Sequence, residues 1–160
     1  MNRSVVTPRK SAEITASVHR LVIRVYYEDT DAAGIVYYAN YLKFAERGRT
    51  EFLRQLGFEQ EKMRRNTGLA FAVRHCRADY LKPARLDDEL TVSTSLIELG
   101  GASLSVAQEI ERGDEPLVRL QFRLACLGPE GRAARLPTEL RAALAPFTRN
   151  PTGVSDSHGP

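Results

Sequence analysis

The second half of the chain is dominated by three long segments in which apolar and polar residues alternate with period two. They cover residues 90–96, 102–110 and 118–126. A Gly-Gly pair separates the first two segments, and a turn at 112–116 that contains Gly and Pro separates the last two. Such alternation is typical of strands with one buried face, and connections this short force neighbouring strands to be antiparallel. The pattern therefore predicts a meander of long antiparallel strands.

Two further strands and one long helix are expected before this meander. Residues 20–27 alternate in the same way, and 69–81 form a β-rich run. Between them, residues 39–56 have helical periodicity. The helix face consists of Tyr41, Ala45, Gly48, Phe52 and Leu56, flanked by Leu42 and Leu53. Because Ala45 and Gly48 are small, this helix is expected to pack closely on its neighbour. The fold class is therefore α+β, with a curved antiparallel sheet of about five strands wrapped around one helix.

One domain accounts for the periodic part of the chain, since 160 residues with 42% apolar content is the size and composition of a single globular domain. Residues 1–18 lack periodicity and are expected to form a loose arm. The domain is expected over 19–146, with a terminal helix or strand remnant near its end. Residues 147–160 are expected to be a disordered tail. Exposed sheet edges favour pairing with a second copy, so at least a homodimer is expected.

Several protein classes are excluded by composition. No apolar run approaches the roughly 20 residues of a membrane helix, and no apolar signal opens the chain, so a cytoplasmic protein is expected. Cys76 and Cys126 are interpreted as small buried side chains. The sequence has no G-x-S-x-G or phosphate-loop motif, and His19, His75 and His158 lie far apart. Serine-hydrolase, nucleotide-fold and metal-site chemistry are therefore not expected.

The stretch YEDTDAAGIVYYANY, residues 27–41, concentrates chemically active groups between the first strand and the helix. It holds the acids Glu28, Asp29 and Asp31, and it leads into residues 35–38, which are expected to be buried. An acid just before a helix can act on a carbonyl that approaches the helix N-terminus. There, free backbone N–H groups and the helix dipole stabilise an oxyanion. The alternative is a solvated connection whose acids face water.

Two motifs carry a resemblance to a known family. The first is Tyr27-x-x-Thr30-Asp31-x-x-Gly34-Ile35-Val36-Tyr37-Tyr38-x-x-Tyr41, followed by FAERGRTEFLRQLG; the second is Tyr80-Leu81-Lys82-Pro83-Ala84-Arg85-Leu86-Asp87-Asp88-Glu89-Leu90. Over residues 19–128 the chain resembles the hot-dog-fold acyl-CoA thioesterases, especially the Tol-Pal-associated and 4-hydroxybenzoyl-CoA subgroups. The resemblance implies hydrolysis of a short-chain or aromatic acyl-CoA by a homodimer or homotetramer. It implies no cofactor, because coenzyme A is part of the substrate.

The resemblance also implies roles for individual residues. Asp31 matches the catalytic carboxylate, which acts as nucleophile or as general base for water. Tyr38 matches the position whose backbone N–H polarises the thioester carbonyl, and Tyr27 matches a tyrosine that lines the site. Gly34 matches the turn glycine before the helix. The neighbouring Val36 and Tyr37 are expected to bind substrate.

One departure from the family pattern concerns Tyr38, because Tol-Pal-type members usually carry His there. A tyrosine has a reference pKa of about 10 and cannot replace His as a base at neutral pH. Asp31 would therefore carry the chemistry nearly alone. This departure keeps an alternative open, in which a hot-dog protein binds acyl-CoA or acyl-carrier protein without hydrolysing it.

Charge is segregated along the chain. The net charge is only +3, but residues 62–85 hold seven basic residues and one acid, and residues 86–115 hold eight acids and one Arg. From the basic segment, Arg74, Arg77, Lys82 and Arg85 are expected to hold the phosphates of coenzyme A. The alternative is solvation or pairing across neighbouring strands. The acidic segment would repel nucleic acid. On the helix, Glu46, Arg47, Arg49 and Glu51 are expected to form a solvated or interfacial row of ion pairs.

Overall fold

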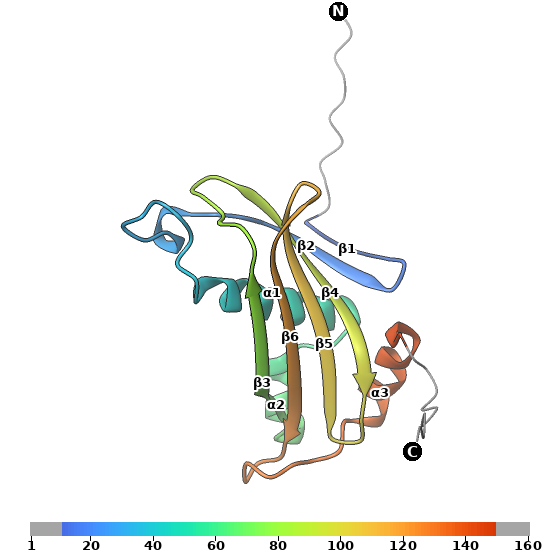
Figure 1. Ribbon diagram of the computed structural model, residues 1–160. Helices are drawn as coiled ribbons and strands as arrows, with labels where there is room; N and C mark the ends of the chain where they lie inside the picture. The colour runs from blue at the N-terminus through green and yellow to red at the C-terminus, as the bar shows by residue number, and fades with distance from the viewer. Residues whose placement is uncertain (1–10, 150–160) are drawn as a thin grey trace, which may run out of the picture.

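The computed structural model describes residues 11–149, which form one curved antiparallel sheet of six strands and a long helix that crosses one face of it (Figure 1). The strands are β1 Ala12–Thr15, β2 Val18–Arg24, β3 Ala70–Tyr80, β4 Glu89–Leu99, β5 Ser103–Arg112 and β6 Glu115–Leu127. Their order across the sheet is β1-β2-β4-β5-β6-β3. The expected α+β hot-dog architecture is confirmed, with one strand more than the sequence indicated.

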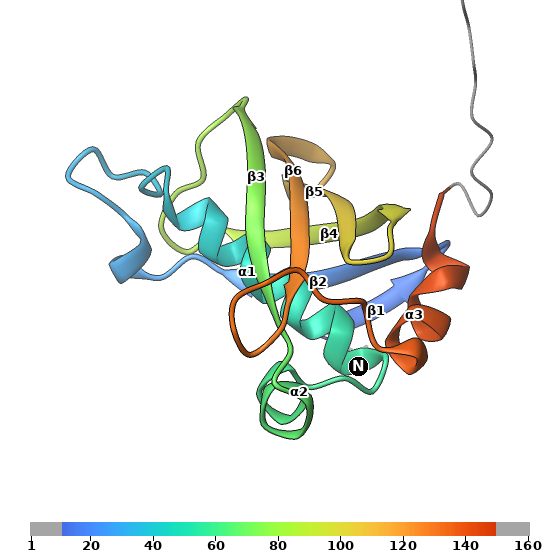
Figure 2. The same cartoon turned by 90° about the horizontal axis from the view of Figure 1, so that it is seen from below.

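The long helix α1, Asn40–Gln55, lies against the inner face of the sheet (Figure 2). Its buried stripe includes the small residues Ala45 and Gly48. A Cβ atom added to Gly48 would lie 2.7 Å from Cγ1 of Val92 and 3.0 Å from Nε2 of Gln108. Side chains cannot approach so closely, so the helix sits against the sheet at the distance that only glycine permits. The prediction of close packing is confirmed.

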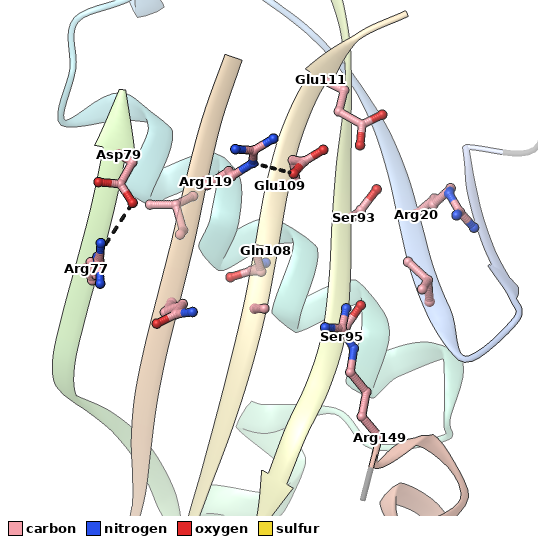
Figure 3. A pocket seen from close by; sticks show the side chains of 14 residues that line it. Arg20, Arg77, Asp79, Ser93, Ser95, Gln108, Glu109, Glu111, Arg119 and Arg149 are labelled. Carbon is pink, nitrogen blue, oxygen red and sulfur yellow. Dashed lines mark hydrogen bonds and ion pairs between the residues drawn. The ribbon is translucent and has the colours of Figure 1, made fainter. Parts of the chain in front are cut away.

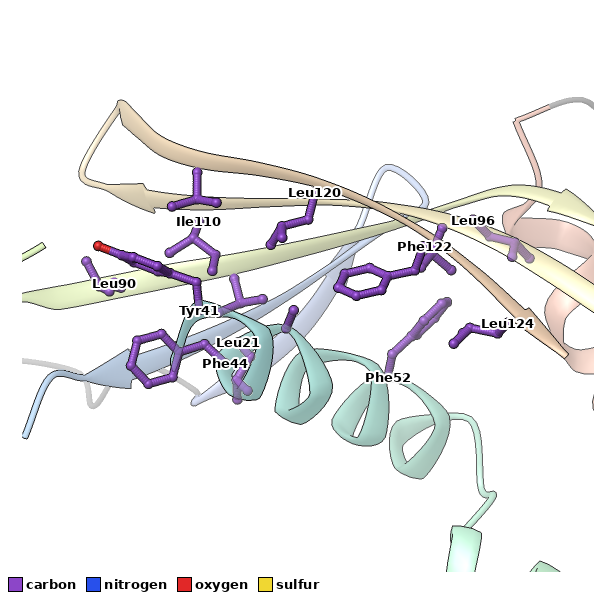
Figure 4. Close-up of a cluster of buried hydrophobic side chains, with 14 of the residues drawn as sticks. Leu21, Tyr41, Phe44, Phe52, Leu90, Leu96, Ile110, Leu120, Phe122 and Leu124 are labelled. Atoms are coloured by element: carbon purple, nitrogen blue, oxygen red, sulfur yellow. The ribbon is translucent and has the colours of Figure 1, made fainter. Parts of the chain in front are cut away.

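The core fills the space between α1 and the sheet. Figure 4 shows Tyr41, Phe44 and Phe52 of the helix pointing toward apolar side chains of the strands. The strand residues are those of the predicted alternation, namely Leu90, Val92, Leu96, Leu104, Val106, Ile110, Val118, Leu120, Phe122 and Leu124. Period-two alternation therefore identified the inner face of the sheet correctly.

Three short helical elements flank this core. The helix α2, Gln60–Thr67, ends at Gly68, whose φ of 72° is the left-handed conformation typical of a helix C-terminus. The helix α3, Thr138–Leu144, and the 3-10 turn η2, Ala145–Phe147, bury Leu140 and Leu144 against the core. The terminal segment is thus helical rather than a strand remnant. No helix within residues 11–149 is long and apolar enough to span a membrane.

The chain ends differ from the expected arm and tail. Residues 12–15 form β1, which pairs with β2 through a turn at Ala16 and Ser17. Both turn residues have positive φ, 50° and 62°, without being Gly or Asn, so the sequence carried no hairpin signal there. At the other end, the ring of Phe147 packs 5.5 Å from that of Phe52. The rest of the expected arm and tail, residues 1–10 and 150–160, lies outside the described residues.

The first long strand is shorter than predicted. It ends at Arg24, and residues 27–29 form a 3-10 turn, η1 Tyr27–Asp29. The prediction that residues 35–38 are buried as a group is also wrong. Val36 is buried, but the rings of Tyr37 and Tyr38 are exposed, because the chain passes over the helix end before it enters α1.

A β-bulge in the edge strand β3 decides which of its side chains face the helix. The register against β6 shifts between Val73 and His75, so Arg74 is an extra residue. As a result, the positions opposite core residues of β6 are Phe71, Val73, Cys76, Ala78 and Tyr80. The prediction of a buried Cys76 is wrong, since this thiol is exposed beside an unpaired sheet edge; Cys126 is buried as expected.

Candidate active site

The two sequence motifs lie side by side at the N-terminal end of α1. Residues 30 and 36 form a β-bridge within the loop, and Ile35 bridges Arg85 of the second motif. The N–H of Val36 donates to the carbonyl oxygen of Ala84 at 2.9 Å. The N–H of Ala84 in turn donates to the hydroxyl of Tyr41 at 2.9 Å. The fold therefore fixes the loop 27–41 between the helix and the segment that precedes β4.

Asp31 lies exposed in a tight turn of this loop. Its Oδ1 accepts a hydrogen bond from the N–H of Ala33 at 2.9 Å, and its carbonyl oxygen accepts one from Gly34 at 3.0 Å. The N–H of Asp31 donates to Ile35 at 2.9 Å, which closes the turn. Gly34 has a φ of 76°, a conformation that side chains disfavour. The expected turn glycine thus holds the carboxylate of Asp31 at the surface, and its Oδ2 has no protein donor within residues 11–149.

The neighbouring acid Asp29 has a different role. It is 7% exposed, and its Oδ2 accepts a hydrogen bond from the N–H of Tyr26 at 2.8 Å. Its carbonyl oxygen accepts hydrogen bonds from the N–H of Tyr37 and from Nδ2 of Asn40. Asp29 therefore anchors the loop to the first turn of α1, whereas Asp31 stays available for chemistry.

The N-terminus of α1 has no side-chain cap. Asn40 donates its N–H to Tyr37, but within residues 11–149 the N–H of Tyr38 has no hydrogen-bond acceptor. The carbonyl oxygen of Tyr38 accepts a hydrogen bond from the Tyr80 hydroxyl at 3.2 Å. This bond fixes the orientation of the peptide next to the free N–H. An uncapped helix start attracts negative charge through its N–H groups and its dipole.

An aromatic cavity of about 270 Å³ opens beside this N–H. It is lined by Ile35, Val36, Tyr38, Tyr41, Tyr80, Leu81, Lys82 and Pro83. The ring of Tyr80 lies 6.0 Å from that of Tyr38 and 5.9 Å from that of Tyr41. Burial raises the pKa of both Tyr41 and Tyr80. These phenols therefore stay protonated near neutral pH and do not act as bases. The hydroxyl of Tyr80 donates to Tyr38, whereas that of Tyr41 accepts from Ala84.

The remaining loop tyrosines are more exposed. The ring of Tyr27 is 83% exposed, and its carbonyl oxygen accepts hydrogen bonds from Thr30. The ring of Tyr37 lies 4.9 Å from that of Tyr38. The adjacent Tyr38 raises the pKa of Tyr37, and Asp31 contributes further.

The four basic residues predicted to bind coenzyme A do not come together. Lys82 lines the aromatic cavity, and Arg85 is bridged to Ile35 of the loop. Arg74 and Arg77 face the other side of the sheet, and for Arg77 this is a consequence of the bulge in β3. Figure 3 shows Arg77 there beside Asp79, 3.6 Å away, among side chains from five strands. Pairing between the basic and acidic segments, the alternative interpretation, also occurs, since Nζ of Lys82 lies 3.7 Å from Oε1 of Glu115.

Sequence reasoning missed a polar cluster beneath α1. Arg49 was expected on the solvent side of the helix, but it is buried and donates to Oε1 of Gln108 at 2.9 Å. Gln108 donates to Thr94 and to the carbonyl oxygen of Ala45. The spacing could have revealed Arg49, because it lies four residues after Ala45 on the apolar stripe. Within residues 11–149, no group of three or more His, Cys, Asp or Glu side chains could hold a metal ion.

Comparison with known proteins places the fold and the site in a family context. Residues 25–144 match the model of the thioesterase-like superfamily. The chain is 42% identical over 122 residues to the acyl-CoA thioesterase YbgC of Haemophilus influenzae, covering 76% of this chain and 90% of that protein. It is 39% identical to the acyl-CoA thioester hydrolase YbgC of Escherichia coli, over 72% of this chain and 87% of that protein. A crystal structure of a probable thioesterase from Bartonella henselae superposes with a TM-score of 0.73 at 40% identity, covering 75% and 99% of the two chains.

Proposed function

The chain belongs to the thioesterase-like superfamily, and from this membership we propose that it hydrolyses the thioester bond of an acyl-CoA to the free acid and coenzyme A. The observation that carries the proposal is the arrangement at the start of α1. An exposed carboxylate, Asp31, and a free N–H, that of Tyr38, lie on one short loop beside an aromatic cavity. A carboxylate and an oxyanion-binding N–H are the minimal groups that thioester hydrolysis needs.

In this proposal the thioester carbonyl approaches the N-terminus of α1. The N–H of Tyr38 donates to the carbonyl oxygen and stabilises the oxyanion that develops during attack, as preorganised donors do in acyl transfer. Asp31 either attacks the carbonyl carbon or removes a proton from the attacking water. The thiolate of coenzyme A then leaves. Where Asp31 is the nucleophile, water hydrolyses the resulting mixed anhydride, which releases the free acid and restores the carboxylate of Asp31. Tyr80 supports this step from a distance by orienting the Tyr38 peptide.

The two ends of the substrate have separate binding groups. In this proposal the aromatic cavity next to Tyr38 holds the acyl group. The resemblance implies that this group is short or aromatic. Lys82 and Arg85 border the same loop and are the basic residues best placed for the coenzyme A phosphates. Arg74 and Arg77 belong to the other face of the sheet, so they are the weaker candidates.

A thiol-release assay over short, long and aromatic acyl-CoAs tests the function. We expect Asp31→Asn to lower kcat by about a thousandfold, because the amide neither attacks nor accepts a proton. Glu28→Gln is the matched control, since Glu28 is an exposed acid of the same loop. Full activity of Asp31→Asn would contradict the assignment. An equal loss of kcat in Glu28→Gln would also contradict it.

A second candidate function is binding of acyl-CoA or acyl-carrier protein without hydrolysis. The observation in its favour is Tyr38, which provides no base beside Asp31 at neutral pH. Calorimetric titration with a coenzyme A thioester distinguishes the two functions. Saturable binding without thiol release would favour the second candidate.

The free edge of β3 supports assembly with a second copy. This strand has 11 residues and pairs with β6 on one side only, which leaves its other backbone edge unpaired within residues 11–149. Such an edge invites pairing with an identical strand. Beside it, Val73 and Tyr80 are each 47% exposed, and an apolar surface of this kind gains from being covered. Sedimentation equilibrium tests the expected homodimer or homotetramer.

A further inference from the structure

A narrow cavity separates the middle of α1 from the sheet. Most of its walls are apolar and include Phe52, Leu53, Phe71, Val73, Leu96, Leu104, Val106, Leu124 and Leu144. Figure 4 shows the ring of Phe52 directed from the helix toward Leu124 of β6 in this region. The polar groups on the cavity wall come chiefly from Arg49 and Glu46 of the helix, with Gln60 and Thr94. The cavity has a volume of about 50 Å³, which is enough for the end of an alkyl chain but not for a bulky ligand.

Arg49 places a cation inside this apolar wall. Its side chain is 8% exposed, whereas its acidic partner Glu46 is 56% exposed and lies at the surface. The guanidinium lies 4.1 Å from the centre of the Phe122 ring and donates to Gln108. Burial lowers the pKa of Arg49, and Glu46 offsets part of this cost. A guanidinium carries more N–H donors than Gln108 and Glu46 use, so donors remain unpaired within residues 11–149.

The inner face of β3 extends from the proposed reaction centre toward the cavity that Arg49 lines. The bulge in β3 places Tyr80, Cys76 and Val73 on the face toward α1. Tyr80 lines the aromatic cavity and Val73 lines the narrow one. Cys76 lies between them along the strand. Along α1, residue 49 lies about 14 Å beyond residue 40, which is the span of about 11 extended carbon atoms.

We propose that this cavity receives the far end of a medium-length acyl chain and that Arg49 makes the enzyme prefer chains with a hydroxyl or keto oxygen there. This inference rests on the proposed function and extends it beyond short or aromatic acyl groups. A neutral oxygen fits better than a carboxylate, because Glu46 already neutralises Arg49. A carboxylate would be desolvated next to that acid without a counter-ion of its own.

The test compares three acyl-CoAs of equal length in the thiol-release assay: dodecanoyl-CoA, ω-hydroxydodecanoyl-CoA and the ω-carboxyl analogue. We expect wild-type kcat/KM to be about tenfold higher for the ω-hydroxy substrate than for dodecanoyl-CoA, which is the worth of one hydrogen bond to a charged donor. The ω-carboxyl substrate should be the poorest. In Arg49→Met the kcat/KM for the ω-hydroxy substrate, divided by the kcat/KM for dodecanoyl-CoA, should fall to about one.

Arg49→Lys serves as a second variant, because it keeps a cation next to Glu46 if the Met variant fails to fold. A shorter side chain with a single ammonium group cannot both stack on Phe122 and donate as the guanidinium does, so the ratio should again fall. Equal rates for the plain and ω-hydroxy substrates in wild type would overturn the inference and leave the proposed function intact. A ratio unchanged in both variants would also overturn it, since Arg49 would then be structural. Absence of hydrolysis of every acyl-CoA would overturn the proposed function and this inference together.

Discussion

The hydroxyl of Tyr80 donates a hydrogen bond of 3.2 Å to the carbonyl oxygen of Tyr38, joining the edge strand β3 to the start of α1. The two residues belong to the two motifs that carry the family resemblance, and their rings also meet edge to face at 6.0 Å. Because the carbonyl and the N–H of Tyr38 belong to rigid, adjoining peptides, a bond to one limits the motion of the other. Tyr80 is therefore a positioning residue for the oxyanion-binding N–H.

Removal of this hydroxyl should slow the reaction without unfolding the protein. We expect Tyr80→Phe to lower kcat/KM by about threefold to tenfold, the worth of one neutral hydrogen bond. The Tm should not change, because the bond is exposed. Tyr80→Leu should lower kcat/KM further, since it also removes ring contacts with Tyr38 and Tyr41. Unchanged kinetics in both variants would show that the peptide is held without Tyr80.

Substitution of Asp29 should lower mainly the stability of the fold, and substitution of Asp31 should lower mainly the catalytic activity. Asp29→Ala removes a buried acceptor and leaves the N–H of Tyr26 unpaired, so the free energy of unfolding should fall by about 1–3 kcal/mol. Asp31→Ala removes an exposed side chain and should change this free energy by less than about 0.5 kcal/mol. Urea denaturation of both variants measures the difference. Equal losses would mean that Asp31 also holds the loop together.

Gly48 should be intolerant of even one methyl group. Gly48→Ala would gain about 1 kcal/mol of helix propensity in an exposed helix. In this helix the new methyl would meet Val92 at 2.7 Å, so we expect a net loss of about 1–3 kcal/mol in the free energy of unfolding. Lys43→Ala, an exposed change on the same helix, is the control and should be nearly neutral. A stabilised Gly48→Ala variant would mean that α1 can move away from β4.

Whether a structural feature of this protein can be predicted from its sequence depends on how far apart in the chain the interacting residues lie. The strands β4, β5 and β6 and the helix α1 follow from local periodicity, because one face of each is buried. The burial of Arg49 could not follow from residue type, since it depends on Gln108 and Phe122 of distant strands. The bulge at Arg74 likewise arises from pairing with β6, and it reverses the face on which Arg77 lies. At the site, periodicity placed three acids before the helix and the resemblance selected Asp31, but the anchoring role of Asp29 depends on its contact with Tyr26 and could not be predicted.

His19 should make the fold less stable as the pH falls. The ring is fully buried on β2 and stacks on Phe52 with 5.5 Å between ring centres. Burial lowers the pKa of His19 below its ordinary value of 6.5, although nearby Glu51 partly opposes this. Below that value the unfolded chain takes up a proton that the folded protein resists, so the free energy of unfolding falls. The slope contributed is at most about 1.4 kcal/mol per pH unit.

His19→Leu should remove this dependence. Urea denaturation from about pH 7.5 down to about pH 5.5 should show the variant gaining stability relative to wild type as the pH falls. Comparison at a single pH would mix this effect with the change in packing against Phe52, so the quantity to compare is the slope. Parallel stability curves for the two proteins would contradict the assignment to His19.

Glu111 should have the opposite effect, destabilising the fold as the pH rises. Figure 3 shows Glu111 near Glu109 on the outer face of β5. Partial burial raises the pKa of Glu111 from 4.5 to about 7, and Glu109 raises it further by competing for the same proton. Between those two values the folded protein holds a proton that the unfolded chain has released, so stability is lost as the pH rises through about 7.

Glu111→Gln should therefore stabilise the protein relative to wild type above pH 7 and have little effect near pH 4.5, because the folded protein then holds Glu111 protonated and thus as neutral as Gln. The gain should be smaller than the shift alone would give, because Glu111 is only partly buried and solvent screens its repulsion from Glu109. Glu98→Gln is the matched control, an exposed acid on the adjacent strand β4. Thermal unfolding at about pH 8 measures both changes. Repulsion between Glu111 and Glu109 predicts a larger gain in stability for Glu111→Gln than for Glu98→Gln. An equal gain in the two variants would contradict this and would assign the effect to the overall acidity of residues 86–115.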